Sequence, residues 1–141
     1  MPPDLQPLGL AIKRVQHRHH RTLDAALIEI GTTLAQWDAL RAIARHPESS
    51  SHKLAGLTFQ TDQSFGSLAN RMVDRGLIRR VAGEGRAILH HLTPEGDAML
   101  AAGNAVADRM LAASFAPLAK AERQQLQALL AKLLGDPDRS A

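Results

Sequence analysis

The chain has 141 residues, a net charge of +3, no cysteine and only 3% aromatic residues. The absence of cysteine excludes disulfides, thiolate zinc sites and cysteine-based redox sensing. No apolar run approaches the roughly 18 residues that a membrane helix needs, and the opening Met1-Pro2-Pro3-Asp4 lacks the layout of a signal peptide. We therefore expect a mainly helical, cytoplasmic protein with no membrane partner.

The positive charge lies in the middle of the chain. Residues 50–91 contain six lysines and arginines and three acidic residues. The rest of the chain contains eleven basic and eleven acidic residues, so its net charge is zero. A basic segment between neutral flanks is typical of a module that binds a polyanion. An ordinary solvated basic surface has the same charge, so this observation alone leaves both interpretations open.

The first part of the chain predicts one long helix over residues 8–30. Its apolar stripe advances by alternating steps of four and three, through Leu8, Ile12, Val15, His19, Leu23, Ala26 and Ile30. A helix of this length seldom buries its stripe within a small subunit, so we expect it to pack against another chain. Thr33 and Gln36 then form the pattern of a capping box for a second helix, which His46-Pro47 ends.

Two short helices and a hairpin are expected next. Serines 49–51 offer caps for a helix around Leu54, and Thr61 suits the start of an amphipathic helix that Gly76 ends. Two helices joined by a short turn are typical of a helix-turn-helix. Residues 77–81 and 87–92 predict two strands joined by a glycine-rich tip. Together they predict a mainly α fold, a winged helix-turn-helix with a small β-hairpin wing.

Long helices are expected again after the hairpin. Thr93-Pro94 combines a capping hydroxyl with a proline at the first helical position, which is a strong helix start. Pro117 breaks the chain, and a final leucine-rich helix begins near Ala119, where no side chain can provide a cap. The winged helix is thus expected to lie between long N-terminal and C-terminal helices.

The amphipathic helix presents a polar face opposite Phe65 and Met72. Amide and hydroxyl side chains on that face suit the major groove, since Asn and Gln can pair with adenine and Ser can bond to several base edges. The expected recognition residues are Thr61, Gln63, Ser64, Gly66, Ser67, Asn70 and Arg71. The expected wing and phosphate contacts are Lys53, Arg75, Arg80 and Arg86. A solvated face would look alike on an isolated helix, but a capped helix precedes this one and an arginine-tipped hairpin follows it.

Several motifs here resemble those of one family. Leu54-Ala55, followed by Gly76-Leu77-Ile78, is similar to the core of the MarR (multiple antibiotic resistance regulator) family, in which a helix-turn-helix leads into a wing. The stretch Asn70–Leu77 resembles the end of the family's recognition helix. Glu84-x-Arg86 and Leu92-Thr93-Pro94-x-Gly96 match the spacing of its Asp-x-Arg wing and of the next helix start.

This resemblance implies a homodimeric transcriptional regulator, a repressor by family expectation, that binds double-stranded DNA at a pseudo-palindromic operator. Residues 8–30 and 94–134 would be dimerisation helices, and residues 33–92 the winged helix-turn-helix domain, within one unit spanning residues 1–141. Arg86 would enter the minor groove. The family's small-molecule effector pocket would be bordered here by His17, Arg21 and Trp37.

The chain also departs from the family pattern. The loop before Glu84 is shorter than usual, and Gly66 and Ser67 stand where relatives often have a threonine and a basic residue. These differences concern the wing tip and the recognition helix. They leave the operator sequence open.

Three other functions can be considered for this sequence: a metal-responsive regulator, a protein-interaction module and an enzyme. His17 and His20 are i, i+3 neighbours that could share a metal in a metal-responsive regulator, but no carboxylate completes the site, and we expect no metal and no cofactor. A winged helix used only for protein contacts would expose an apolar recognition face. No nucleophile elbow, phosphate loop or metal motif is present, so we expect no enzyme.

Overall fold

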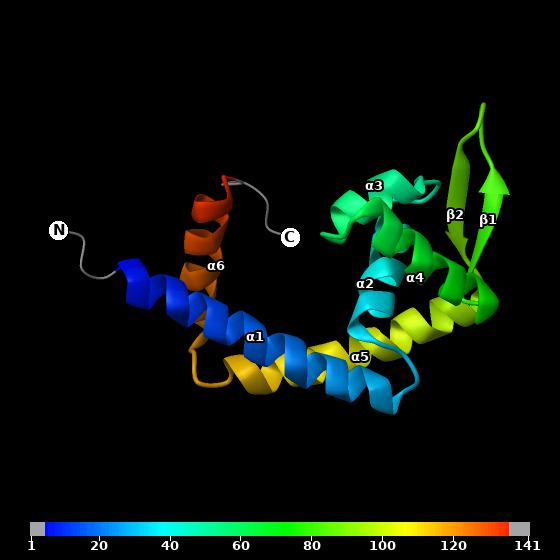
Figure 1. The fold of residues 1–141 in the computed structure, drawn as a ribbon. Coiled ribbons are helices and arrows are strands. Elements are labelled where there is room, and N and C mark those ends of the chain that lie inside the picture. Colours follow the sequence, from blue (N-terminus) through cyan, green and yellow to red (C-terminus); the bar gives the residue numbers. More distant parts are fainter. Residues whose placement is uncertain (1–4, 136–141) are drawn as a thin grey trace. The chain divides into compact units, whose positions relative to one another are not determined.

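The computed structural model describes residues 5–135, so the opening residues used to argue against a signal peptide lie outside it. The elements follow in the order α1 (Leu5–Glu29), α2 (Leu34–Arg45), α3 (Ser51–Leu57), α4 (Asp62–Asp74), β1 (Ile78–Ala82), β2 (Ile88–Leu92), α5 (Pro94–Phe115) and α6 (Lys120–Leu134) (Figure 1). This order confirms the expected fold class, mainly α with one two-stranded hairpin. The chain forms two compact units, whose boundary falls within α5 between Ala107 and Asp108.

The junction between α1 and α2 is held by side chains. Thr33 caps α2, because its hydroxyl accepts a hydrogen bond from the backbone amide of Gln36 at 3.1 Å. Asp24 of α1 accepts from the amide of Leu34 at 2.9 Å. Only half of the expected capping box forms: the Gln36 side chain turns inward and accepts from the hydroxyl of Thr32 at 3.1 Å.

The core of the first unit lies between α2, the helix-turn-helix and the base of the hairpin. Its buried members are Ala39, Leu40, Ala42, Ile43, Leu54, Ala55, Phe65, Leu68, Ala69, Met72, Leu77 and Ile78. Every third or fourth residue of α4 contributes, as expected for an amphipathic helix. The opposite face of α4 is therefore left to solvent or to a partner.

The turn between α3 and α4 is tight and carries an unusual residue. Phe59 has a left-handed backbone (φ 57°), and its side chain is 98% exposed. A non-glycine residue pays about 1–2 kcal/mol for this conformation. The turn is stabilised on both sides, because Thr58 donates to the Leu54 carbonyl at 2.7 Å and the Thr61 hydroxyl accepts from the Ser64 amide at 3.0 Å.

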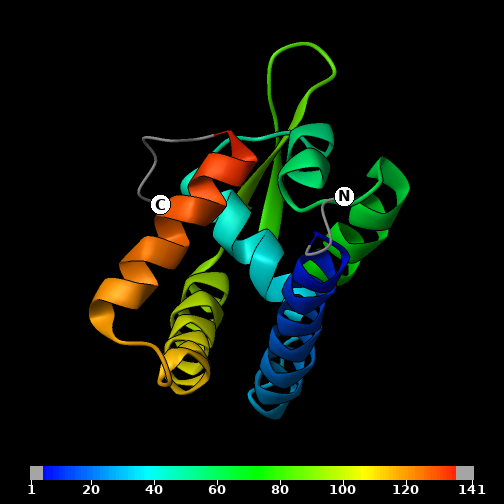
Figure 2. The ribbon, with the colours of Figure 1, turned by 90° about the vertical axis from the view of Figure 1, so that its left-hand side faces the viewer.

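The hairpin projects beyond the helices of the same unit (Figure 2). β1 and β2 are antiparallel, with Arg80 opposite His90 and Ala82 opposite Ile88, so each strand begins one residue later than expected. At the tip, the Gly83 amide donates to the carbonyl of Ala87 at 2.8 Å. Halfway along β2, an isolated bridge joins His90 to Ser49 before α3, which ties the wing to the helix-turn-helix.

α5 begins as expected and approaches its neighbours closely. The hydroxyl of Thr93 accepts from the amide of Gly96 at 3.0 Å and donates to the carbonyl of Gly76 at 2.5 Å. A Cβ at Gly96 would collide with the carbonyl of Leu77, and one at Gly103 would collide with the Trp37 indole. Glycine is thus required at both positions for this packing distance.

The second unit contains the end of α5 and all of α6. As expected, Ala119 provides no side-chain cap, and the backbone amide of Ala119 instead donates to the carboxylate of Glu122 at 2.9 Å. Four leucines of α6 are exposed to solvent, namely Leu129, Leu130, Leu133 and Leu134. None of the helices in the described part of the chain is both long enough and apolar enough to cross a bilayer.

Candidate nucleic-acid interface

The outward face of α4 is polar along its whole length. Of the seven expected recognition residues, six are exposed and Gly66 is half-buried. Phe65 and Met72, on the opposite face, are completely buried. The face therefore consists of amide, hydroxyl and guanidinium groups on a rigidly packed helix, which is the chemistry that base edges and phosphates require.

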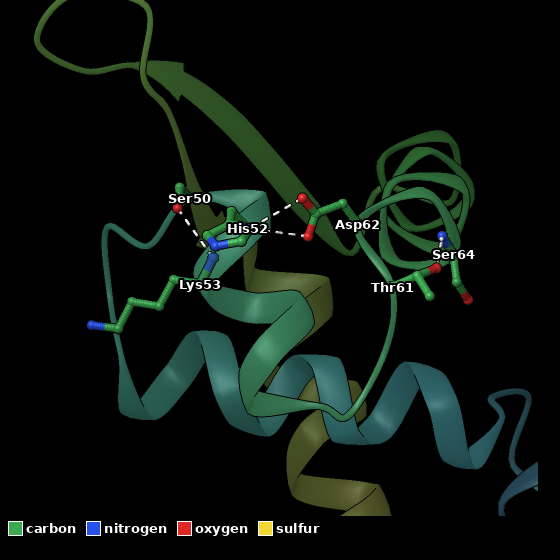
Figure 3. A network of polar contacts seen from close by, with 6 residues as sticks. All are labelled: Ser50, His52, Lys53, Thr61, Asp62 and Ser64. Carbon is green, nitrogen blue, oxygen red and sulfur yellow. Dashed lines mark hydrogen bonds and ion pairs between the residues drawn. The ribbon is translucent and has the colours of Figure 1, made fainter.

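α3 and α4 begin side by side, and a hydrogen-bonded pair of side chains, His52 and Asp62, joins their first turns (Figure 3). Nδ1 of His52 lies 3.1 Å and 3.0 Å from the two carboxylate oxygens of Asp62. Lys53, an expected phosphate contact, is exposed and extends away from this pair (Figure 3). Its backbone amide donates to the hydroxyl of Ser50, which caps α3.

Sequence reasoning did not find this pair. Neither His52 nor Asp62 is among the contacts expected from the sequence. Ten residues separate the two, and they come from different helices, so no helical spacing connects them in the sequence. Only the turn between α3 and α4 brings them together.

Arg75 was expected to contact phosphate, but the structure gives its guanidinium intramolecular partners. Nη1 donates to the side-chain oxygen of Gln36 at 2.6 Å, and Nη2 donates to the carbonyl of Gly31 at 2.5 Å. Arg75 thus connects the end of α4 to the junction between α1 and α2. Arg71, one turn earlier, is exposed on the outward face of α4.

The wing carries two of the expected basic contacts. Arg86 is exposed in the tip, next to Gly85, whose backbone is left-handed (φ 65°). Arg80 is exposed and pairs across the hairpin with His90, so it lies on the side of the sheet that faces the helix-turn-helix. Arg79 pairs with His91 and lies on the other side. The register therefore favours Arg80 over Arg79 for a contact with the same partner that the polar face of α4 binds.

His90 is a structural residue of this interface. Its side chain is completely buried, and its Nδ1 lies 2.9 Å from the carbonyl oxygen of Ser49, to which it can donate. Its ring stacks edge-on against Phe65 with a centroid distance of 6.2 Å. Burial lowers the pKa of His90, and the positive charges of Arg80 and His91 lower it further, against the Ser49 hydrogen bond. A neutral imidazole therefore joins the wing to α3.

The three expected effector-pocket residues do not come together. His17 and Arg21 line a hollow of about 920 Å³ along α1, together with Lys13, Arg14 and Arg18. Trp37 lies instead in the packed interior, where it is 5% exposed and donates from Nε1 to Asn104 at 3.0 Å. Its ring is also covered by the guanidinium of Arg41 at 4.4 Å.

His17 and His20, the two histidines of the metal-responsive alternative, gain no further ligand in the described part of the chain. Among residues 5–135, no three histidine or acidic side chains cluster closely enough to hold a metal ion. His20 lies near Asp38 of α2. Burial raises the pKa of the Asp38 carboxyl, and the positive charges of Arg41 and His20 partly offset this rise.

These features define a winged helix-turn-helix protein: a polar recognition helix, a preceding capped helix and a basic hairpin. Comparison with known proteins agrees, because the model of the MarR family matches residues 30–87. The chain is also 30% identical over 135 residues to the HTH-type transcriptional repressor Rv2887 of Mycobacterium tuberculosis, covering 94% of this chain and 97% of that protein. The protein belongs to the MarR family, a family of winged-helix transcriptional regulators.

Solved structures show the same fold. Rv2887 in complex with DNA superimposes with a TM-score of 0.76 at 27% identity, covering 90% of this chain and 97% of that one. The complex of Rv2887 with salicylic acid superimposes with a TM-score of 0.75 at 29% identity, covering 90% of this chain and 96% of that one. A MarR mutant from E. coli, solved with operator DNA, superimposes with a TM-score of 0.84 at 22% identity, covering 95% of this chain and 98% of that one. At this identity the similarity supports the fold and nothing further.

Proposed function

We propose that the protein is a homodimeric transcriptional repressor that binds a pseudo-palindromic operator through α4 and the wing. The observation that carries the proposal is the face of α4, which is polar and exposed from Thr61 to Arg71 while the opposite face is buried. A helix of this kind suits the major groove, with its first residues at base edges. Such a repressor acts by occluding a promoter, and it works in the cytoplasm, where it meets DNA.

Each part of the interface has a separate role in this proposal. Gln63, Ser67 and Asn70 read base edges, because amide and hydroxyl groups match the donors and acceptors of the major groove. Lys53 and Arg71 contact phosphates, and Arg86 enters the minor groove beside the recognition helix. The alternative, a winged helix used only for protein contacts, is disfavoured, since it requires apolar side chains on the exposed face of α4.

The homodimer is supported by α1. Five of its large apolar side chains are between 41% and 61% exposed, and they lie in its first half, at Leu5, Leu8, Leu10, Ile12 and Val15. Exposed apolar surface of this extent on one helix is typical of an interface. A second copy of the chain covers it in our proposal, and the two-fold axis then sets two α4 helices about one DNA turn apart.

A small aromatic acid is the effector class that fits best. The hollow along α1 carries four cations, Lys13, Arg14, Arg18 and Arg21, next to Leu10 and Val15. Because Leu10 and Val15 also belong to the apolar surface that the second copy covers, a ligand there lies at the edge of the proposed dimer interface. Apolar side chains next to several cations suit a planar ring that carries a carboxylate. The solved complex of the relative Rv2887 with salicylic acid supports this class. A ligand there releases DNA only if it prefers the unbound arrangement of the dimer.

The first experiment is fluorescence anisotropy with labelled DNA from upstream of the protein's own gene, titrated against a shuffled duplex at two salt concentrations. Tight, selective binding that weakens with salt is expected for a specific regulator. Salicylic acid added to the complex should lower the anisotropy. Failure to bind either duplex at low salt would overturn the proposal. Equal binding to both duplexes would mean that the protein binds DNA without recognising an operator sequence.

Asn70 tests base recognition directly. Its replacement by alanine should cost about 1–3 kcal/mol on the operator and little on the shuffled duplex, because only a base contact distinguishes the two sequences. A uniform loss on both duplexes would instead make Asn70 a backbone contact.

A further inference from the structure

The hydrogen-bonded pair of His52 and Asp62 lies where the two helices of the helix-turn-helix begin, and both side chains are largely exposed, at 87% and 67%. An exposed pair of this type contributes little to folding stability. Its position next to the N-terminus of the recognition helix places a carboxylate close to DNA, where negative charge is unfavourable. The helix dipole favours an acid such as Asp62 in the first turn of α4, but it does not account for the histidine that faces it.

The geometry leaves one nitrogen of His52 available. Nδ1 faces both oxygens of Asp62, so the proton on Nδ1 is donated to the carboxylate. Nε2, on the other side of the ring, then points away from Asp62. In the neutral ring Nε2 is an acceptor and repels a phosphate oxygen, whereas in the protonated ring it carries a proton and can donate to that oxygen.

We propose that His52, oriented by Asp62, is a phosphate contact that forms only when its imidazole is protonated, so that operator affinity rises as the pH falls. The first helix of a helix-turn-helix crosses the DNA backbone, and Lys53 beside His52 is exposed on the same first turn of α3. Protonation brings the pair from a net charge of −1 to zero and adds one donor for a phosphate. The inference rests on the DNA-binding function proposed above.

The other charged groups near His52 do not compete for this role. Asp62 of α4 is its hydrogen-bonded partner, and Lys53 extends away from the pair (Figure 3). Behind α3 lies the buried His90 of β2, 3.4 Å from the hydroxyl of Ser51, with Arg80 opposite it in the sheet. His90 favours its neutral form, so its own protonation opposes folding rather than assisting DNA binding.

The experiment measures the dissociation constant of the full-length protein for operator and shuffled DNA at about pH 6 and about pH 8, across a range of salt. The wild type should bind on the order of tenfold more tightly at the lower pH, since a dimer has two such pairs. The slope of log affinity against log salt should steepen by about 2 at the lower pH, one phosphate contact for each protomer.

Variants separate this role from a structural one. His52→Gln should lose the pH dependence and keep the weaker affinity at both pH values. Asp62→Asn should bind more tightly than the wild type at the higher pH, because a negative charge near DNA is gone, and should show a smaller pH effect. His46→Gln, a control histidine at the end of α2, should behave as the wild type. Circular dichroism would confirm that all three variants fold.

The outcomes distinguish the two proposals. Selective operator binding with the same affinity and salt slope at both pH values would overturn the role of His52 and leave the repressor function intact. A pH effect that persists in His52→Gln would also overturn it. Absence of DNA binding at both pH values would overturn the DNA-binding function and the inference together.

Discussion

Arg75 donates a 2.6 Å hydrogen bond to the side chain of Gln36, which connects the last turn of the recognition helix to the first turn of α2. Gln36 is itself buried and accepts from Thr32 as well. A single guanidinium thus joins α4 to the segment that leads out of α1. The position of the end of α4 is therefore linked to the junction between α1 and α2.

Replacing Arg75 by alanine should lower the free energy of unfolding by about 1–2 kcal/mol, because two charge-assisted hydrogen bonds are lost and the Gln36 oxygen loses its strongest donor. Chemical denaturation measures this loss. On DNA, Arg75→Ala should keep the salt slope of the wild type, whereas Arg71→Ala should reduce it by about one for each protomer. Equal reductions in the two variants would mean that Arg75 leaves Gln36 to bind phosphate in the complex.

Arg86 tests the shortened wing. Arg86→Ala should weaken binding to most duplexes and most strongly to those with a narrow, A·T-rich minor groove, which attracts arginine electrostatically. Competition between A·T-rich and G·C-rich flanking sequences measures the preference. Lys132→Ala, in the last turn of α6, is a control cation outside the proposed interface. An Arg86→Ala variant with wild-type affinity on every duplex would show that the wing tip does not reach the DNA.

Gly103 tests the packing of α5 on Trp37. A methyl group at this position would collide with the indole, so Gly103→Ala should destabilise the protein by about 1–3 kcal/mol despite the better helix propensity of alanine. Gly56→Ala is a matched control, since Gly56 also lies within a helix but has no atom near its Cβ position. That variant should gain up to about 1 kcal/mol. Thermal unfolding of both variants decides the matter, and a stabilised Gly103→Ala would refute the close contact.

His90 predicts acid sensitivity of the fold. Burial lowers its pKa in the folded state, so the unfolded chain binds a proton first as the pH falls. The stabilising contribution is complete above the unfolded value of about 6.5 and is lost as the pH falls toward the folded pKa. Unfolding free energies measured between about pH 5 and 8 should decline toward the acid end. His90→Gln should be less stable at every pH but should show a flatter profile, and an unchanged slope would contradict the assignment.

Much of the fold followed from local signals in the sequence. Thr33, Thr61 and Thr93 were predicted as helix starts, and each hydroxyl accepts a backbone hydrogen bond three residues ahead in the structure. The period of the apolar residues in α4 identified both its buried face and its exposed one. Such predictions succeed because a cap or a helical face is decided within a few residues of chain.

The failures concern contacts between distant segments. The partners of Arg75 lie 39 and 44 residues away, and no local pattern distinguishes a guanidinium bonded to Gln36 from one that awaits a phosphate. Trp37 was expected at a pocket, but Gly103 and Asn104 enclose it from α5. Phe59 was missed for a different reason, since it holds a left-handed turn that its residue type disfavours.

The bridge between Ser49 and His90 has a consequence for how the wing meets DNA. It holds the middle of β2 to the segment before α3, whereas the backbone hydrogen bonds of Gly83 and Ala87 lie within the tip. In the proposed complex, a wing whose strands are tied to the helix-turn-helix would leave the tip to adapt to minor grooves of different width, while α4 keeps its position in the major groove.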